Sequence, residues 1–298
     1  MTRSILLRPV RAAYELSRFV ALHALPTPLW RARQLAAPRV ECGDRVVVSL
    51  TTIPDRIARI APTLHSLLDQ TRRPDAIVLN LPSRARREAR HYVLPDFLAA
   101  LDAVTRVDCG EDRGPATKLL PTLERERDPD TRILVVDDDQ VYPPRFVETL
   151  VAWSERLPDS AVCARGFAIP AGFDIANRNT LYGTHLAVPE RVEIMQGSSG
   201  FLVRRRFFDA RVFDYSEAPP EAFFVDDVWF AGQLARAGVD RFVVPFDDCF
   251  SRMATWTARK SLSLWTRENA DGSNDAVLYR HFRGVWKAID AGAAGRPS

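Results

Sequence analysis

Apolar and polar residues alternate in a regular order along the chain from about residue 45 onward. Short apolar runs rich in β-branched residues are typical of buried strands. Such runs occur at 45–50, 76–81, 104–107, 132–136, 161–168, 200–203 and 241–244. Between them, apolar residues three or four positions apart predict helices that start near 62, 95, 115, 146 and 226. This alternation predicts an α/β fold with a mostly parallel sheet flanked by helices.

Residues 1–44 differ from the rest and are predicted to form a basic amphipathic leader. From 10 to 25 the pattern is helical, with Arg11, Glu15 and Arg18 on one narrow stripe and mostly apolar residues on the other side. Such a helix either lies in a membrane interface or packs on the body of the protein, and the sequence leaves both uses open. No apolar stretch has the roughly 18 residues that a spanning helix needs.

The composition is that of a globular protein with a sizeable core. Hydrophobic residues make up 46% and charged residues 27% of the 298 positions. The net charge of +3 arises in the leader, because the chain beyond residue 40 has 34 basic and 37 acidic residues. That distribution argues against nucleic-acid binding. The four cysteines form no disulfide or zinc pattern, so we expect a cytoplasmic protein, with peripheral contact to the inner face of a membrane left open.

The most informative segment is the apolar run at 132–136, because three carboxylates follow it directly. Asp137, Asp138 and Asp139 are therefore expected at the carboxyl end of a central strand, where open α/β sheets bind their ligands. Adjacent like charges repel, and a divalent cation with oxygen ligands and substrate phosphates would compensate them. The alternative is an acidic turn that is simply solvated.

This segment resembles the DxD motif of GT-A-fold, nucleotide-sugar-dependent glycosyltransferases, and is similar to that of glycosyltransferase family 2. The resemblance implies a Rossmann-like GT-A domain over 45–290, with a nucleotide-binding half at 45–155 and an acceptor-binding half at 156–290. It also implies Mn²⁺ or Mg²⁺ as the cofactor, bridging the diphosphate of the donor. Asp139 would be the main metal ligand, and Asp137 would contact the ribose or the metal. The leader is left unexplained.

Two further segments of the first half fit a nucleotide pocket. The first strand runs into 51–56, where small hydroxyls and a guanidinium suit a base and a ribose, although a plain strand-ending turn is equally compatible. The Gly-flanked loop 108–118 enters a helix and would present free backbone N–H groups to an anion. Lys118 would reach a diphosphate from there, or would be an exposed helix lysine. The residues assigned to the nucleotide are Thr51, Thr52, Arg56, Asp112, Lys118, Asp137 and Asp138.

The second half supplies candidates for the sugar and for catalysis. The segment 196–200 combines glycines and serines, which suit a close-lying sugar but also a hairpin turn. Asp227 opens a predicted helix and aligns with the last acid of the family's xED-type motif, which implies a general base; helix capping is the alternative. His281 would be a further metal ligand by family habit, although a His beside aromatic residues is usually structural. The residues assigned to the sugar and acceptor are Gly197, Ser198, Ser199, Gly200 and Asp226.

These segments together predict a metal-dependent, inverting glycosyltransferase of the hexosyltransferase type. It would move a sugar from a nucleotide diphosphate-sugar to a hydroxyl of a glycan or glycolipid, with polysaccharide or glycolipid assembly expected by family habit. A sugar-1-phosphate nucleotidyltransferase shares the sheet and the acid-bound metal, but normally has a Gly-rich loop after the first strand, and 49–56 contains no glycine. A non-catalytic, membrane-associated scaffold would suit the leader but gives no reason to keep the acids together.

Overall fold

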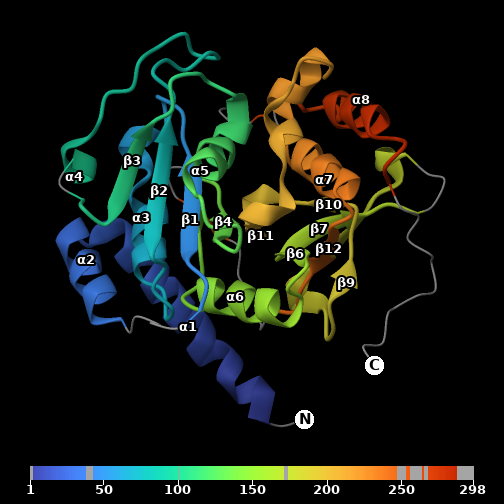
Figure 1. The fold of residues 1–298 in the computed structure, drawn as a ribbon. Helices are drawn as coiled ribbons and strands as arrows, with labels where there is room; N and C mark the ends of the chain where they lie inside the picture. Colours follow the sequence, from blue (N-terminus) through green and yellow to red (C-terminus); the bar gives the residue numbers. More distant parts are fainter. Residues whose placement is uncertain are drawn as a thin grey trace.

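The computed structural model describes residues 3–37, 43–99, 101–170, 174–246, 253–255, 264 and 268–286 (Figure 1). The α-helices are α1 (Arg3–Ala24), α2 (Thr27–Ala36), α3 (Ala61–Leu68), α4 (Asp96–Ala99), α5 (Leu120–Arg125), α6 (Phe146–Arg156), α7 (Asp226–Arg236) and α8 (Ser273–His281). The strands are β1 (Val46–Thr51), β2 (Ala76–Leu81), β3 (Val104–Asp108), β4 (Arg132–Val135), β5 (Gln140–Val141), β6 (Ser160–Cys163), β7 (Arg165–Ala168), β8 (Asn179–Tyr182), β9 (Glu190–Arg191), β10 (Ile194–Met195), β11 (Phe201–Arg204), β12 (Asp240–Val243) and β13 (Met253–Ala254).

Within the described residues, the central sheet has eight strands in the order β3-β2-β1-β4-β11-β6-β12-β9. β3, β2, β1 and β4 are parallel neighbours, as are β6 and β12, whereas β11 and β9 run antiparallel to the strands beside them. The predicted, mostly parallel sheet is confirmed. The chain leaves β1 toward β2 and β3 and then crosses back to β4, so the strand order reverses between β1 and β4. Open α/β sheets have their binding crevice at such a reversal.

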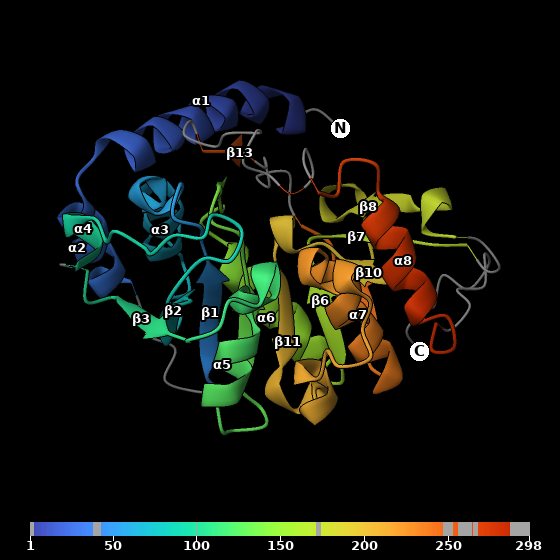
Figure 2. The ribbon, with the colours of Figure 1, turned by 90° about the horizontal axis from the view of Figure 1, so that it is seen from above.

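The central strands are buried on both faces, which explains why their sequences are apolar without alternation. Val46, Val48 and Leu50 of β1 belong to a core layer shared with α1, α3 and α6. Ile133 and Val135 of β4 belong to the opposite layer, shared with α5 and α7. Figure 2 shows α1 and α3 on one side of the sheet and α5 and α7 on the other. The two layers fix the position of the strand ends that carry the site.

The leader forms α1 and α2, which pack on α3. Phe19 and Leu22 are buried, and Arg18 donates a 2.8 Å hydrogen bond to the buried Asp69 that follows α3. Tyr14, on the mostly apolar side of the helix, is exposed. The pattern predicted the helix correctly, and the buried Asp69 explains why Arg18 of the polar stripe faces the protein. Among the described residues, no helix has both the length and the apolar character to cross a bilayer.

Other differences from the predicted elements come from tertiary contacts. The run 161–168 is two strands, since β7 leaves the central sheet to pair with β8 and β10. The loop 108–118 ends in a 3-10 helix, Gly114–Lys118, before α5 begins. The helices α2 and α8 were not predicted. The pattern does not indicate α8 because this helix is mostly polar, with Leu278 as its buried residue.

Candidate functional site

A cavity of about 670 Å³ opens at the carboxyl ends of β1 and β4, where the strand order reverses. Both halves of the chain line it, through the ends of these strands, the loop before α5, the start of α7 and the small sheet of β7, β8 and β10. The lining side chains include eight carboxylates and five basic groups. A volume of this size accommodates a small-molecule ligand, and the excess of carboxylates suits one that arrives with a cation.

The three acids after β4 have different surroundings. The side chains of Asp137 and Asp139 are 27% and 22% exposed, whereas that of Asp138 is 7% exposed. Asp138 accepts hydrogen bonds from Thr52 at 2.5 Å and from Arg56 at 2.8 Å. Asp138 therefore joins the end of β4 to the segment after β1, while its two neighbours stay accessible from the cavity.

Lys118 lies at the centre of the site and is buried. Its Nζ is 2.6 Å from Asp137 Oδ1 and 3.0 Å from Asp226 Oδ2. Burial alone would lower the pKa of Lys118, but Asp137, Asp226 and Asp227 outweigh burial and raise it well above its ordinary value. The ammonium stays charged and links the two halves of the chain, which excludes the alternative of an exposed helix lysine.

A buried polar network holds the backbone of Lys118 against the sheet. Ser49 of β1 donates a 2.5 Å hydrogen bond to the carbonyl oxygen of Lys118, and its hydroxyl lies 2.6 Å from that of Thr122. Asn80 of β2 donates to both hydroxyls at 3.1 Å. Buried polar groups stabilise a structure when they are paired in this way, so the network fixes the lysine's position relative to β1 and β2.

Asp226 and Asp227 occupy the first turn of α7, where the helix dipole favours negative charge. Asp227 Oδ1 accepts a 2.9 Å hydrogen bond from the backbone N–H of Gly197. A Cβ at 197 would lie 3.0 Å from both Asp227 Oδ1 and Lys118 Nζ, so glycine permits this close approach. Burial, and next Asp226, raise the pKa of Asp227 well above its ordinary value, although Lys118 opposes the rise. A raised pKa makes the ionised carboxylate a better proton acceptor.

Oxygen donors for a divalent cation are present on the cavity wall. Asp137 and Asp139 are the accessible carboxylates beside β4. Burial, and next the charge of Asp138, raise the pKa of Asp139 to about 6 despite the nearby Arg56. No three His, Cys, Asp or Glu side chains in the described ranges are arranged to hold a metal. Two carboxylates nevertheless fit Mg²⁺, which commonly takes one or two from a protein and completes its coordination with phosphates and water.

Most of the predicted site residues line the cavity: Thr51, Thr52, Arg56, Asp112, Lys118, Asp137, Asp138, Asp139, Ser198, Asp226 and Asp227. Gly197 is hydrogen-bonded to Asp227, which lines the cavity. Ser199 is buried, and Gly200, with φ of +82°, packs so closely on Phe146 that a Cβ there would meet its ring at 2.3 Å, so both residues serve the core. His281 is exposed at the end of α8, stacked 6.5 Å from Trp229, outside the cavity lining. The structure therefore does not bring His281 to the acids, contrary to the prediction.

Two lining residues have internal partners that the sequence did not indicate. Thr51 donates a 2.8 Å hydrogen bond to the carbonyl oxygen of Asn80. Asp112 accepts hydrogen bonds from the backbone N–H groups of Arg86 at 2.6 Å and Gly114 at 2.8 Å. The N–H group of Gly114 is thus already paired, which corrects the expectation of free donors in this loop.

Basic residues of the second half also line the cavity, and no sequence motif marks them. Arg165 of β7 and Arg178, just before β8, both line it. Asp275, in the first turn of α8, is a further lining acid. In the first half, Arg87 also lines the cavity and lies 3.3 Å from Glu268. An arginine in a predicted hairpin gives no motif signal, and the pairing of β7 with β8 places Arg165 and Arg178 at the same small sheet.

Solved structures supply a likeness over nearly the whole chain. A mannosyltransferase from Pyrobaculum calidifontis, in complex with GDP-Man and Mn²⁺, matches with a TM-score of 0.51 and 16% identity, covering 95% of this chain and 77% of that chain. The chain has the GT-A fold. The fold implied by the acidic motif is thereby confirmed.

Two other solved structures are similar to a lesser degree. GalNAc-T7 with UDP, GalNAc and Mn²⁺ has a TM-score of 0.47 and 13% identity over 67% of this chain and 42% of that chain. A 4-diphosphocytidyl-2C-methyl-D-erythritol synthase has a TM-score of 0.43 and 11% identity over 76% and 99%. The sequence matches no protein-family model and no curated protein.

Proposed function

We propose that the protein is a metal-dependent glycosyltransferase that moves a sugar from a nucleoside diphosphate-sugar to an acceptor hydroxyl. The observation that carries the proposal is the meeting of 137–139, Lys118 and Asp227 in one cavity at the reversal point of a GT-A sheet. The similar mannosyltransferase, solved with GDP-Man and Mn²⁺, supports a donor and a metal of these kinds. In this proposal residues 45–155 bind the nucleotide and 156–290 bind the acceptor.

The first half of the cavity holds the donor. Thr52 and Arg56, fixed by Asp138, contact the nucleoside. Asp137 and Asp139 hold Mn²⁺ or Mg²⁺, which would neutralise charge on the departing diphosphate. Lys118 adds a permanent positive charge beside the same phosphates, and burial keeps it from being screened by water.

The second half activates the acceptor. Asp227 removes the proton of the acceptor hydroxyl, whose oxygen forms a bond to the anomeric carbon as the bond from that carbon to the diphosphate oxygen breaks. The nucleoside diphosphate leaves with the electron pair from the opposite face, so the configuration inverts. Gly197 holds one oxygen of Asp227, which orients the carboxylate for the proton transfer.

The leader, in our proposal, contacts an anionic membrane surface. Large apolar side chains on α1 and α2 are exposed, namely Tyr14, Leu16, Val20, Leu29 and Leu35. Residues 1–40 also contain seven arginines and one acid. Arg18, Arg31 and Arg33 pair with carboxylates of the protein body, and the remaining positive charge complements anionic lipid. Sedimentation with phosphatidylglycerol vesicles should carry down the wild type but not Leu16→Glu with Leu29→Glu. Equal sedimentation of both proteins would rule out this contact.

The donor site is tested by thermal unfolding with UDP, GDP, CMP and TDP, each with Mn²⁺ or with a chelator. A ligand that binds only native protein at a hundred times its Kd stabilises it by about 2.7 kcal/mol. We expect one nucleotide to raise the Tm in the presence of the metal, and Asp139→Ala to lose that rise. Asp159→Ala, at a side chain that is 87% exposed and outside the cavity, is the matched control.

A rise in Tm that is the same in Asp139→Ala and in wild type would contradict the role given to that acid. If no nucleotide stabilises the protein in either buffer, the donor site does not exist and the scaffold alternative takes its place.

A further inference from the structure

The cavity has a second basic wall that the proposed chemistry does not use. It is the small sheet of β10, β7 and β8, which lies on the α7 side of the molecule, away from β2 and β3 (Figure 2). Arg165 and Phe167 are two positions apart on β7, so their side chains share one face. The register of the pairing sets Tyr182 of β8 opposite Arg165 and Thr180 opposite Phe167.

Each of the two arginines on this wall is stacked on an aromatic ring. The guanidinium carbon of Arg165 is 4.9 Å from the centroid of the Tyr182 ring, and that of Arg178 is 4.8 Å from the centroid of Phe167. Stacking holds a guanidinium plane still while the N–H donors at its edge remain available. The two cations are therefore preorganised side by side on the cavity wall.

These arginines differ from the cations of the first half in having no close ion pair among the described residues, although the charge of Arg178 acts on Asp275, where burial raises the pKa and Arg178 opposes the rise. Lys118 and Arg56 each lie within 3.2 Å of two carboxylates. Within the described chain, neither Arg165 nor Arg178 has a carboxylate oxygen within 4.0 Å. Arg178 donates to the carbonyl oxygen of Ile175 at 3.1 Å, and Arg165 Nε is buried with no hydrogen-bond partner in those residues. A buried donor left unpaired is unfavourable unless a ligand supplies the acceptor.

We propose that Arg165 and Arg178 bind an oxyanion carried by the acceptor, a phosphate or a carboxylate. The inference rests on the proposed glycosyl transfer and adds the class of acceptor to it. The fork of N–H groups on a guanidinium matches both oxyanions in a bidentate way. The neutral hydroxyl that reacts would then belong to a molecule anchored by its charge.

The anion belongs to the acceptor rather than the donor because of where Asp227 lies. Asp227 is hydrogen-bonded to Gly197, and the N–H of the preceding Gln196 donates to the carbonyl oxygen of Arg165 at 3.0 Å. Asp227, the proposed base, is therefore linked through Gly197 and Gln196 to the strand that carries Arg165, and it also interacts with the charge of Lys118. A molecule that offers its hydroxyl to Asp227 from the side opposite the diphosphate meets the arginines.

The test measures probe binding to protein saturated with Mn²⁺ and the nucleotide that stabilises it most, so that the donor position is filled. Glucose 6-phosphate and glucuronate are the two charged probes, and glucose is the neutral one. We expect a charged probe to bind the wild type, and Arg165→Gln and Arg178→Gln to bind it about tenfold to a hundredfold more weakly. Which probe binds identifies the anion as a phosphate or a carboxylate.

Arg156→Gln is the matched control, because Arg156 is an exposed arginine stacked 4.8 Å from the Trp153 ring and lies outside the cavity. Nucleotide-dependent stabilisation should be unchanged in all three variants. If no nucleotide binds, the proposed function fails by itself, and the probes are then titrated without it. Binding of a charged probe that is equal in wild type and both cavity variants, or no better than that of glucose, would overturn the anion site.

Discussion

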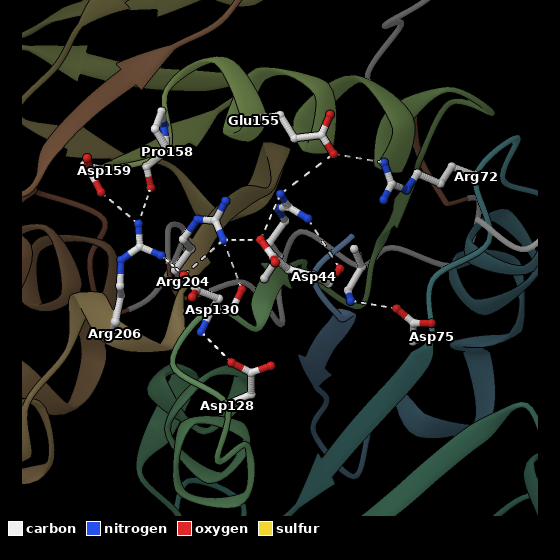
Figure 3. A network of polar contacts seen from close by, with 12 residues as sticks. Asp44, Arg72, Asp75, Asp128, Asp130, Glu155, Pro158, Asp159, Arg204 and Arg206 are labelled. Carbon is white, nitrogen blue, oxygen red and sulfur yellow. Dashed lines mark hydrogen bonds and ion pairs between the residues drawn. The ribbon is translucent and has the colours of Figure 1, made fainter. Parts of the chain in front are cut away.

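Two clusters of charged side chains lie at opposite ends of β4, and they differ in the ratio of acidic to basic groups. The Asp44 cluster, at the amino end, joins four carboxylates to four guanidinium groups (Figure 3): Asp44, Asp130, Glu155, Asp159, Arg72, Arg132, Arg204 and Arg206. Arg132 and Arg204 face each other across β4 and β11, and both reach Asp44. Two neighbouring arginines on paired strands repel, and the shared carboxylate offsets part of that repulsion. Burial, and next the charge of Arg204, still lower the pKa of Arg132.

The Asp137 cluster, at the carboxyl end, holds five carboxylates and two cations: Asp137, Asp138, Asp139, Asp226, Asp227, Arg56 and Lys118. Burial, and next the neighbouring acids, raise the pKa of Asp139 and of Asp227, whereas in the Asp44 cluster the hydrogen bond from Arg204 is the main cause that lowers the pKa of Asp44. Charges that are matched by partners need no ligand, whereas an excess of carboxylates in a cavity is typical of a site that binds a cation or a cationic group. The difference favours a structural role for the Asp44 cluster and a binding role for the Asp137 cluster.

The largest effect should follow from Asp227→Asn, which removes the proposed base but keeps the size of the side chain. We expect the release of nucleoside diphosphate from the donor to slow by about 10²- to 10⁴-fold. The Tm should stay the same or rise, because a buried carboxylate disappears. Stopped assays of nucleotide release and a thermal melt check both. Full activity with a lowered Tm would reverse the comparison and make Asp227 structural.

The next effect concerns Arg204→Met in the Asp44 cluster. Removing one partner from a buried network leaves polar groups unpaired, so we expect the free energy of unfolding to fall by about 2–4 kcal/mol. Urea denaturation measures the loss. Nucleotide binding by the folded protein should remain at the wild-type level, because the cluster lies at the far end of β4. A loss of binding with unchanged stability would show that the two clusters are not separate in function.

Glu193 is a buried carboxylate outside the cavity, and it allows the effect of such a group on the free energy of unfolding to be measured. Burial raises its pKa to about 7 from 4.5, and Arg241 donates to its carbonyl oxygen rather than to its carboxylate. The Glu193 carboxyl therefore loses its proton at a lower pH in the unfolded state than in the folded state. As a result, the free energy of unfolding falls as the pH rises from about 4.5 to 7. Glu193→Gln should remove about 1–2 kcal/mol of that fall, as measured by denaturation at pH 5 and pH 8. Glu190→Gln, at an exposed residue, should keep the wild-type slope.

The smallest effect is expected at the exposed rim of the Asp44 cluster. Asp159 pairs with Arg206 at 2.8 Å but is largely exposed, so water screens the pair. Asp159→Ala should change the free energy of unfolding by less than about 0.5 kcal/mol. Together with Arg204→Met it gives a graded series within one cluster. A loss as large as that of Arg204→Met would mean that burial does not govern the cluster's contribution.

The amino-acid pattern predicted the parts of the site that are local in sequence. The acids at 137–139 follow a buried strand, and Asp227 opens a helix, so periodicity alone located both. His281, predicted as a metal ligand, lies outside the cavity lining because α8 places it against Trp229. The amino-acid pattern also does not reveal that Arg18 pairs with Asp69, which follows α3.

The residues that the sequence could not reveal are those brought in by pairing between distant segments. Ser49, Asn80 and Thr122 form one network only because β1, β2 and α5 meet. Arg165 reaches the cavity because β7 leaves the main sheet for β8. No motif marks any of these positions.

The sequence by itself determined the α/β class, the main strands and helices of the central sheet, and the acids at the end of β4, because hydrophobic periodicity and short-range turns are properties of neighbouring residues. The tertiary structure alone decided which charges are matched. It set Lys118 between Asp137 and Asp226, gave Asp138 its internal partners, and left Arg165 with no carboxylate partner among the residues that the structure describes. The energy of a buried charge depends on the groups that surround it in space, and those groups come from distant parts of the chain.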